Sequence, residues 1–200
     1  MLRLAITGGL CSGKSAVAEM LRQLGCPVVD ADALARRELE AAAGELAAAF
    51  GEGVLAPGGG VDRARVAELV FTGPGAEARR QTLHRILHPR VMAAAGAQLA
   101  AWEAEGAACA GVEAALLIEE QRLDGFDRVL LVTAPVETRI ERYLARGGSR
   151  AQAEARIAVQ WSDERKQARA DAVIRNDGRL EDTRRQVAAV MAQWKHEVNP

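Results

Sequence analysis

The sequence of 200 residues has few cysteines, no long apolar run and no excess of charge of either sign. Its three cysteines, Cys11, Cys26 and Cys109, are odd in number and widely separated, a pattern that favours neither a disulfide framework nor a zinc site. No apolar run approaches the ~20 residues that cross a bilayer, and the N-terminus lacks the basic start and cleavage site of a secretory signal. We therefore expect a cytoplasmic protein without a membrane partner.

The formal net charge is −1, from 26 basic and 27 acidic residues, so no global field attracts nucleic acid. Hydrophobic residues make up 49% and charged residues 26% of the chain, which argues against wholesale disorder. A chain of 200 residues has the size of one elaborated domain rather than two independent ones. We expect a single domain, present as a monomer or weak homo-oligomer.

Short strand patterns alternate with helical patterns along the chain. Strands are expected at residues 2–7, 27–30, 109–114, 128–133 and 172–174. The run 129–132 is apolar throughout, as in a parallel sheet that is covered on both faces. The alternation predicts an α/β fold with a doubly wound, five-stranded parallel sheet.

Two helical stretches interrupt this alternation. Residues from about 33 to 105 are rich in alanine, and breaks at 56–60 and 73–75 divide them. Residues from about 139 to 167 are polar and contain a break at 147–149. The single domain is therefore expected to comprise a core (about 1–32, 106–138 and 168–200), a helical insertion (about 33–105) and a second helical segment (about 139–167), which we call the lid.

A glycine-rich loop lies between the first strand and the first helix. Residues 8–15, Gly-Gly-Leu-Cys-Ser-Gly-Lys-Ser, fit the phosphate-loop pattern G-x-x-x-x-G-K-[ST] in the strand-loop-helix context that supports it. Backbone N–H groups and the helix N-terminus would hold the phosphates of ATP, Lys14 would bridge the terminal phosphates, and Ser15 would bind Mg²⁺. The cofactor-binding residues expected here are Gly8, Gly9, Cys11, Ser12, Gly13, Lys14, Ser15 and Ala16. The alternative is a glycine-rich turn with a solvated lysine.

Two acidic residues, Asp30 and Asp32, follow the second strand. They lie at its carboxyl end, where open α/β sheets bind ligands. Phosphoryl transfer requires a group that orients the acceptor hydroxyl and accepts its proton, and Asp30 and Asp32 are both placed to supply it. The competing interpretation is that Asp32 caps the helix that begins at Ala33.

The lid carries a basic face. Arg139, Arg142 and Arg146 are spaced i, i+3 and i+7 on one predicted helix, so they share a face. Between residues 139 and 169, eight basic residues stand against four acidic ones. We interpret Arg142 and Arg146 as catalytic groups that neutralise charge on the transferred phosphate when the lid closes. A solvated helical face is the alternative.

With these residues in place, the sequence resembles the dephospho-CoA kinase family over nearly the whole chain. The motifs occur in the family's order: residues 6–15, 28–32, Val61-Asp62-Arg63, Val70-Phe71, Ile86-Leu87-His88-Pro89, Leu116-Leu117-Ile118-Glu119, and 170–174 with Asn176 and Gly178. The resemblance implies a P-loop kinase that transfers the γ-phosphate of ATP to the ribose 3′-hydroxyl of dephospho-CoA, giving CoA and ADP. It also implies Asp32 as the base, Lys14 on the phosphates and Asn176 against adenine, although an Asn-Asp-Gly turn would also explain Asn176.

The chain departs from that family's usual pattern at five positions. It has Cys11 for glycine, Ala16 for threonine, Ala115 for proline, Ile118 for phenylalanine and Arg139 for glutamine. None of these removes a required charge or hydroxyl, so they bear on loop geometry more than on chemistry. Cys11 is either a redox switch, because cysteines at helix N-termini have low pKa values, or a small residue that fits the loop, which we favour.

From the residues alone, other functions stay open. Another P-loop kinase, acting on a nucleoside or nucleotide, would use the same phosphate loop. A nucleotide-dependent switch protein would typically carry an Asn-Lys-x-Asp guanine motif, which this sequence lacks. An inactive binding module would release no ADP with any acceptor.

Overall fold

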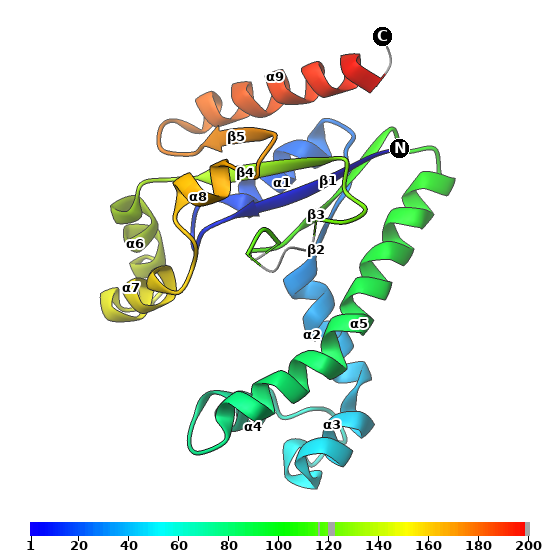
Figure 1. The fold of residues 1–200 in the computed structure, drawn as a ribbon, viewed down its shortest axis with the longest axis vertical. Coiled ribbons are helices and arrows are strands. Elements are labelled where there is room, and N and C mark those ends of the chain that lie inside the picture. Colours follow the sequence, from blue (N-terminus) through cyan, green and yellow to red (C-terminus); the bar gives the residue numbers. More distant parts are fainter. Residues whose placement is uncertain (116, 120–122, 199–200) are drawn as a thin grey trace. The chain divides into compact units, whose positions relative to one another are not determined.

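The computed structural model describes residues 1–115, 117–119 and 123–198 (Figure 1). Leu116, which begins one of the motifs quoted above, lies outside the described residues. The chain divides into two compact units, one formed by Met1–Asp30 with Leu99–Pro200 and the other by Ala31–Gln98. The phosphate loop belongs to the first unit, and Asp32 belongs to the second.

A five-stranded sheet with the strand order β2-β3-β1-β4-β5 forms the centre of the first unit. The strands are β1 (Leu2–Gly8), β2 (Val28–Asp30), β3 (Cys109–Glu113), β4 (Arg128–Thr133) and β5 (Ala172–Arg175). Every pairing between neighbouring strands is parallel. The predicted α/β fold with a five-stranded parallel sheet is confirmed, and the strands lie within a residue of their predicted positions.

Apolar side chains cover both faces of the sheet. Helices α1 (Lys14–Gln23) and α9 (Leu180–Val198) pack against each other on one face, where Leu4, Leu21 and Leu130 are fully buried. The other face carries a cluster formed by Ala5, Leu117, Ile118 and Val129, against which Trp161 packs. Each large apolar side chain buried in this way stabilises the fold by roughly 1.5–3 kcal/mol. Burial on both faces explains why residues 129–132 of β4 form a continuous apolar run.

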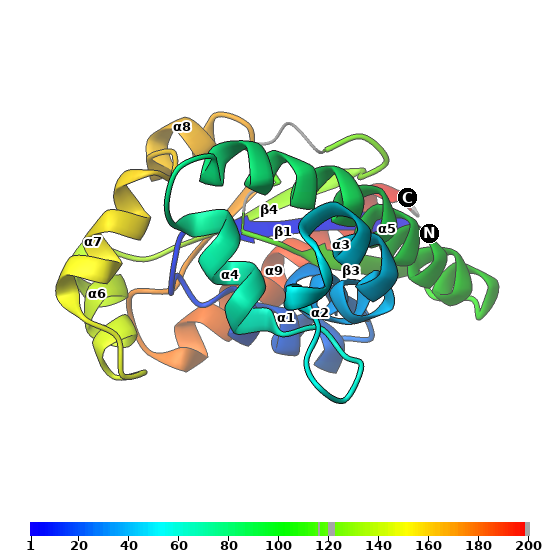
Figure 2. The ribbon, with the colours of Figure 1, turned by 90° about the horizontal axis from the view of Figure 1, so that it is seen from below.

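Three helices lie between β4 and β5 in the chain. Helix α6 (Val136–Leu144) follows β4, α7 (Arg150–Ala158) packs against α6, and the short α8 (Asp163–Gln167) packs against β4. Figures 1 and 2 show α6 and α7 side by side beyond the carboxyl end of β4. The polar stretch that follows the predicted break at 147–149 is divided into two helices, because Ser149 caps α7 and Ser162 caps α8.

The second unit is helical. It contains α2 (Ala31–Ala41), α3 (Ala43–Phe50), the 3₁₀ helix η1 (Glu52–Val54), α4 (Arg63–Phe71) and most of α5 (Ala76–Ala104). Its core includes Leu46, Val54, Val66 and Val70, and the Asp62 carboxylate caps α4 by accepting from the Arg65 N–H at 2.9 Å. In the described part of the chain no helix, the 29-residue α5 included, is both long and apolar enough to cross a membrane.

Candidate functional site

The loop between β1 and α1 has a backbone that only glycine permits at two positions. A Cβ atom on Gly8 would lie 2.2 Å from the carbonyl oxygen of Val132. Gly13 has φ 101°, and a Cβ atom there would lie 1.9 Å from Nδ2 of Asn176. The glycines of the predicted motif therefore serve close backbone approach and left-handed geometry, and the simple alternative of a solvated turn does not account for such packing.

Lys14 folds back over the loop that precedes it. Its Nζ donates to the carbonyl oxygens of Gly8 at 3.1 Å and Gly9 at 3.3 Å. Helix α1 begins at Lys14, so the positive end of its dipole faces the same loop as the ammonium group. The first turn of α1 has no acidic residue that would offset this positive charge. This combination favours an anion such as a phosphate group.

Cys11 takes a strained backbone conformation at the tip of the loop. It has φ 54° and is the only non-glycine residue with positive φ among those that the structure describes. The Ser12 N–H donates to the Gly9 carbonyl at 3.2 Å, so Leu10 and Cys11 are the central residues of a tight turn. The left-handed region costs a non-glycine residue about 1–2 kcal/mol.

Two side chains hold the second half of the loop. The Asn176 amide donates through Nδ2 to the Ser12 carbonyl at 2.9 Å and accepts from Thr183 Oγ1 at 3.0 Å. The Arg142 guanidinium donates to the carbonyl oxygens of Cys11 and Ser12, both at 3.3 Å, and to that of Asn176 at 2.8 Å. Both residues thus lie at the loop and contact its carbonyl oxygens, whereas the sequence interpretation had placed Asn176 against adenine and Arg142 on the transferred phosphate.

The three arginines of the predicted basic face have different surroundings. Arg139 is 5% exposed, Arg142 is half-buried against the loop, and Arg146 is exposed. Arg139 forms an ion pair with Asp163 of α8 at 3.5 Å. The spacing predicted a shared face on one helix, but α6 ends at Leu144, so Arg146 lies in the turn beyond it. Arg139 is buried where it meets Asp163 of α8.

Glu113 is a site residue that the sequence interpretation missed. Its carboxylate accepts a 2.9 Å hydrogen bond from Ser15 Oγ and is 7% exposed. Burial raises its pKa above the ordinary value, while the Ser15 hydrogen bond lowers it and the charge of Asp30 raises it further. Glu113 pairs with Asp30 across β3 and β2, so the end-of-strand argument that selected Asp30 would also have found Glu113.

Asp32 lies in the first turn of α2, directly after β2. The helix begins at Ala31, two residues earlier than the predicted start at Ala33. Asp32 is therefore inside the helix rather than at the capping position before it, and its side chain is exposed. The capping interpretation of Asp32 is wrong for this reason.

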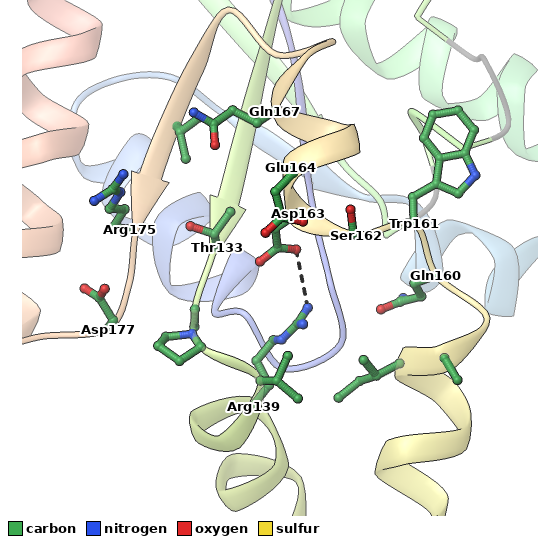
Figure 3. A pocket seen from close by; sticks show the side chains of 16 residues that line it. Thr133, Arg139, Gln160, Trp161, Ser162, Asp163, Glu164, Gln167, Arg175 and Asp177 are labelled. Carbon is green, nitrogen blue, oxygen red and sulfur yellow. Dashed lines mark ion pairs between the residues drawn. The ribbon is translucent and has the colours of Figure 1, made fainter.

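A cavity of about 600 Å³ lies among α6, α7, α8 and the ends of β4 and β5 (Figure 3). The Arg139–Asp163 ion pair lies inside it, and Gln160 extends from the segment that leads into α8. Burial raises the pKa of Asp163, and the charges of Arg139 and Lys166 oppose this effect. Polar groups are thus concentrated beside the phosphate loop, where Gln160 Oε1 accepts from the Leu10 N–H at 2.9 Å.

Comparisons with known proteins give a consistent result. The dephospho-CoA kinase family model matches residues 2–182. The dephospho-CoA kinase of Geobacillus kaustophilus is 40% identical over 197 residues, which cover 96% of this chain and 96% of that protein. A crystal structure of a Thermus thermophilus protein has a TM-score of 0.83 and 38% identity, covering 96% of this chain and 97% of that one. The dephospho-CoA kinase structure from Campylobacter jejuni, with a TM-score of 0.68, 24% identity and 96% coverage of both chains, shows the same fold.

Proposed function

The chain belongs to the dephospho-CoA kinase family, and from this premise we propose which of its residues carry out the reaction. The enzyme is an ATP-dependent kinase that phosphorylates the ribose 3′-hydroxyl of dephospho-CoA, in the last step of coenzyme A biosynthesis. The main observation that supports these residue roles is the geometry of the phosphate loop between β1 and α1.

ATP would bind with its phosphates against the loop from Gly8 to Ser15. The N-terminus of α1 and the Lys14 ammonium supply the positive field, and backbone N–H groups of the loop that have no partner within the protein supply donors. Asn176 and Arg142 donate hydrogen bonds to carbonyl oxygens of the loop. Because each peptide unit is planar, these bonds also fix the direction of the neighbouring N–H groups. We assign Asn176 this positioning role in addition to the adenine contact that the family resemblance implies.

The residues present fit a magnesium ion. Mg²⁺ takes oxygen ligands, keeps several waters and is held by one or two carboxylates together with substrate phosphates. The Ser15 hydroxyl and the buried Glu113 carboxylate, 2.9 Å apart, form such a pair, and the described residues hold no cluster of three metal-binding side chains that would compete. Ser15 and Glu113 would hold the ion, which neutralises charge on the phosphates when it is bound.

Asp32 would act as the general base. Its carboxylate would orient the acceptor hydroxyl and take its proton as the hydroxyl oxygen bonds to the γ-phosphorus and the bond to ADP breaks. The family motif at residues 28–32 and the position of Asp32 two residues after β2 support this role.

Two parts of the chain would serve as substrate-binding elements. The helical insertion (about 33–105) would bind the acceptor, and the lid (about 139–167) would exclude water and bring Arg142 and Arg146 to the transferred phosphate. Arg146 is exposed and so is available to a ligand, whereas Arg142 would exchange part of its contact with the loop for the phosphate.

We further propose a cytoplasmic enzyme that works as a monomer or weak homo-oligomer. Three cysteines present as free thiols are compatible with a reducing compartment. Size-exclusion chromatography with light scattering measures the oligomeric state directly.

The test is coupled ADP production with dephospho-CoA as acceptor, run beside Asp32→Asn and with nucleoside monophosphates as alternative acceptors. The variant is expected to lose at least ~100-fold in turnover, the contribution of a positioned general base. Asp124→Asn, a change of an exposed aspartate, is the control and is expected to keep normal turnover. Near-normal turnover of Asp32→Asn would remove Asp32 from the mechanism.

A further inference from the structure

Gln160 is the one side chain between α7 and α8 that hydrogen-bonds the phosphate loop among the described residues. Its Oε1 accepts from the Leu10 N–H at 2.9 Å, across 150 residues of chain. We propose that Gln160 is a positioning residue, which sets the conformation of the first half of the phosphate loop and thereby the affinity for the nucleotide. This inference deepens the proposed function and rests on it.

The loop needs external support at this point. Leu10 and Cys11 are the central residues of the turn closed by the Ser12 N–H and the Gly9 carbonyl, and Cys11 has φ 54°. Turns with positive φ at the second central position ordinarily have glycine or asparagine there. Since Cys11 adopts it at a cost, other conformations of the turn compete, and the hydrogen bond to Leu10 favours the observed one.

The two halves of the loop are held by different side chains. Arg142 and Asn176 hold the carbonyl oxygens of Cys11 and Ser12, whereas Gln160 holds the N–H of Leu10. At Gly9 a Cβ atom would lie 3.4 Å from Oε1 of Gln160 and 1.9 Å from a terminal nitrogen of Arg139. The segment therefore packs directly on the backbone of the loop, and a shift of Gln160 would be transmitted to it.

Two ion pairs formed by α8 fix the segment that carries Gln160. Asp163, three residues further along, pairs with Arg139 at 3.5 Å, and the fully buried Lys166 pairs with Glu119 at 2.7 Å. Figure 3 shows the first pair next to the Gln160 segment. Because a separated buried charge is costly, these pairs hold α8 in place and keep the short segment before it from moving.

A purely structural role for Gln160 predicts a different result from a positioning role. If Gln160 only packs the segment, its removal lowers stability and leaves nucleotide affinity unchanged. If it positions the loop, its removal weakens ATP and ADP binding and raises the KM for ATP, while the KM for dephospho-CoA stays the same. The loss of one hydrogen bond corresponds to about a five- to tenfold change in affinity.

The experiment compares Gln160→Met with Gln152→Met. Methionine keeps the length of glutamine and removes the acceptor, and Gln152 is a matched control because its Oε1 accepts from the Ser149 N–H within the cap of α7. We expect Gln160→Met to weaken ATP and ADP binding in calorimetry about five- to tenfold, with kcat and the KM for dephospho-CoA changed less than about twofold. Gln152→Met is expected to lower the melting temperature without changing nucleotide affinity.

Three results would overturn the proposal: unchanged nucleotide affinity in Gln160→Met, an equal rise of both KM values, or the same loss in Gln152→Met. If Gln160→Met fails to fold, amide hydrogen exchange of the unaltered protein tests the proposal instead. The Leu10 N–H is expected to be protected by its hydrogen bond to Gln160, and rapid exchange of this amide would contradict the proposal. Calorimetry measures binding without turnover, so it stays informative even if the assignment of Asp32 or of the acceptor were wrong.

Discussion

The hydroxyl of Ser15 donates a 2.9 Å hydrogen bond to the buried carboxylate of Glu113. The bond links the first turn of α1 to the end of β3, so the residue expected to bind magnesium already faces a carboxylate. A glutamate 7% exposed has lost most of its hydration, and the fold keeps it there with few compensating contacts. Such a group is expected at a functional site more than in a core selected for stability.

Glu113→Gln is expected to lower turnover by about 10- to 100-fold, the usual effect of changing a residue that orients a metal site. The amide keeps the shape of the side chain but removes its charge, so a higher Mg²⁺ concentration should restore part of the activity. The measurement is ADP production against Mg²⁺ concentration, with the exposed Glu105→Gln as control. A variant with unchanged turnover and unchanged Mg²⁺ dependence would contradict the role.

The same substitution has a predictable effect on stability. Burial holds the pKa of Glu113 above its ordinary value of 4.5, so the native carboxyl binds its proton at a higher pH than the unfolded one. The Glu113 carboxyl therefore contributes most to the free energy of unfolding below about pH 4.5, where it is protonated in both states. This contribution is lost as the pH rises through the native pKa. Glu113→Gln should therefore be more stable than the unaltered protein near pH 7, and this difference should shrink toward pH 4.5. Urea unfolding at both pH values measures it, and a difference that grows on acidification would contradict the argument.

Much of the fold could be predicted because its signals are local. The run 129–132 and the glycines of the loop each act within a few residues, and strand, loop and helix followed in order. The contacts that complete the site could not be predicted in this way. Asn176 meets Ser12 across 164 residues of chain, and Gln160 meets Leu10 across 150. Neither helical nor strand periodicity carries information at such separations.

The arginines of α6 show the same limit at shorter range. Spacing placed Arg139, Arg142 and Arg146 on one predicted face, but it could not show that Arg142 contacts the phosphate loop while Arg139 is buried. The difference arises from Asp163 of α8, which neutralises Arg139 and buries it. A charge pattern on one helix identifies a face, and the partner of that face decides which residue is available to a ligand.

Cys11→Gly is expected to stabilise the protein slightly. Glycine removes a left-handed strain of about 1–2 kcal/mol, and its extra freedom in the unfolded chain costs roughly 0.5–1 kcal/mol. The net gain should be about 0–1.5 kcal/mol, with turnover close to normal, since the thiol has no role in the proposed chemistry. Cys11→Ala is the control: it keeps the Cβ atom and therefore the strain. Chemical denaturation compares the variants, and an alanine variant as stable as the glycine variant would contradict the strain argument.

Lys166→Met tests the ion pair that holds α8. Lys166 is fully buried and its Nζ lies 2.7 Å from Glu119 Oε1, so its removal leaves a carboxylate in a site with little water. Loss of one partner from a buried pair typically costs about 3–5 kcal/mol, and urea unfolding should show a loss of that size. Adding Glu119→Gln removes the unpaired charge and is expected to restore much of the stability.

An exposed ion pair is expected to contribute much less to stability than the buried pair of Lys166 and Glu119. Arg150 of α7 and Glu137 of α6 also form an ion pair, but both side chains are about half exposed at 49% and 59%, so water screens them. Arg150→Met should therefore change stability little, and Glu137→Gln should not interact with it in a double-mutant cycle. If Lys166→Met behaved like Arg150→Met, the Glu119 carboxylate would have to be hydrated in solution. The Lys166–Glu119 pair would then not hold α8 in place, and it could not keep Gln160 at the phosphate loop.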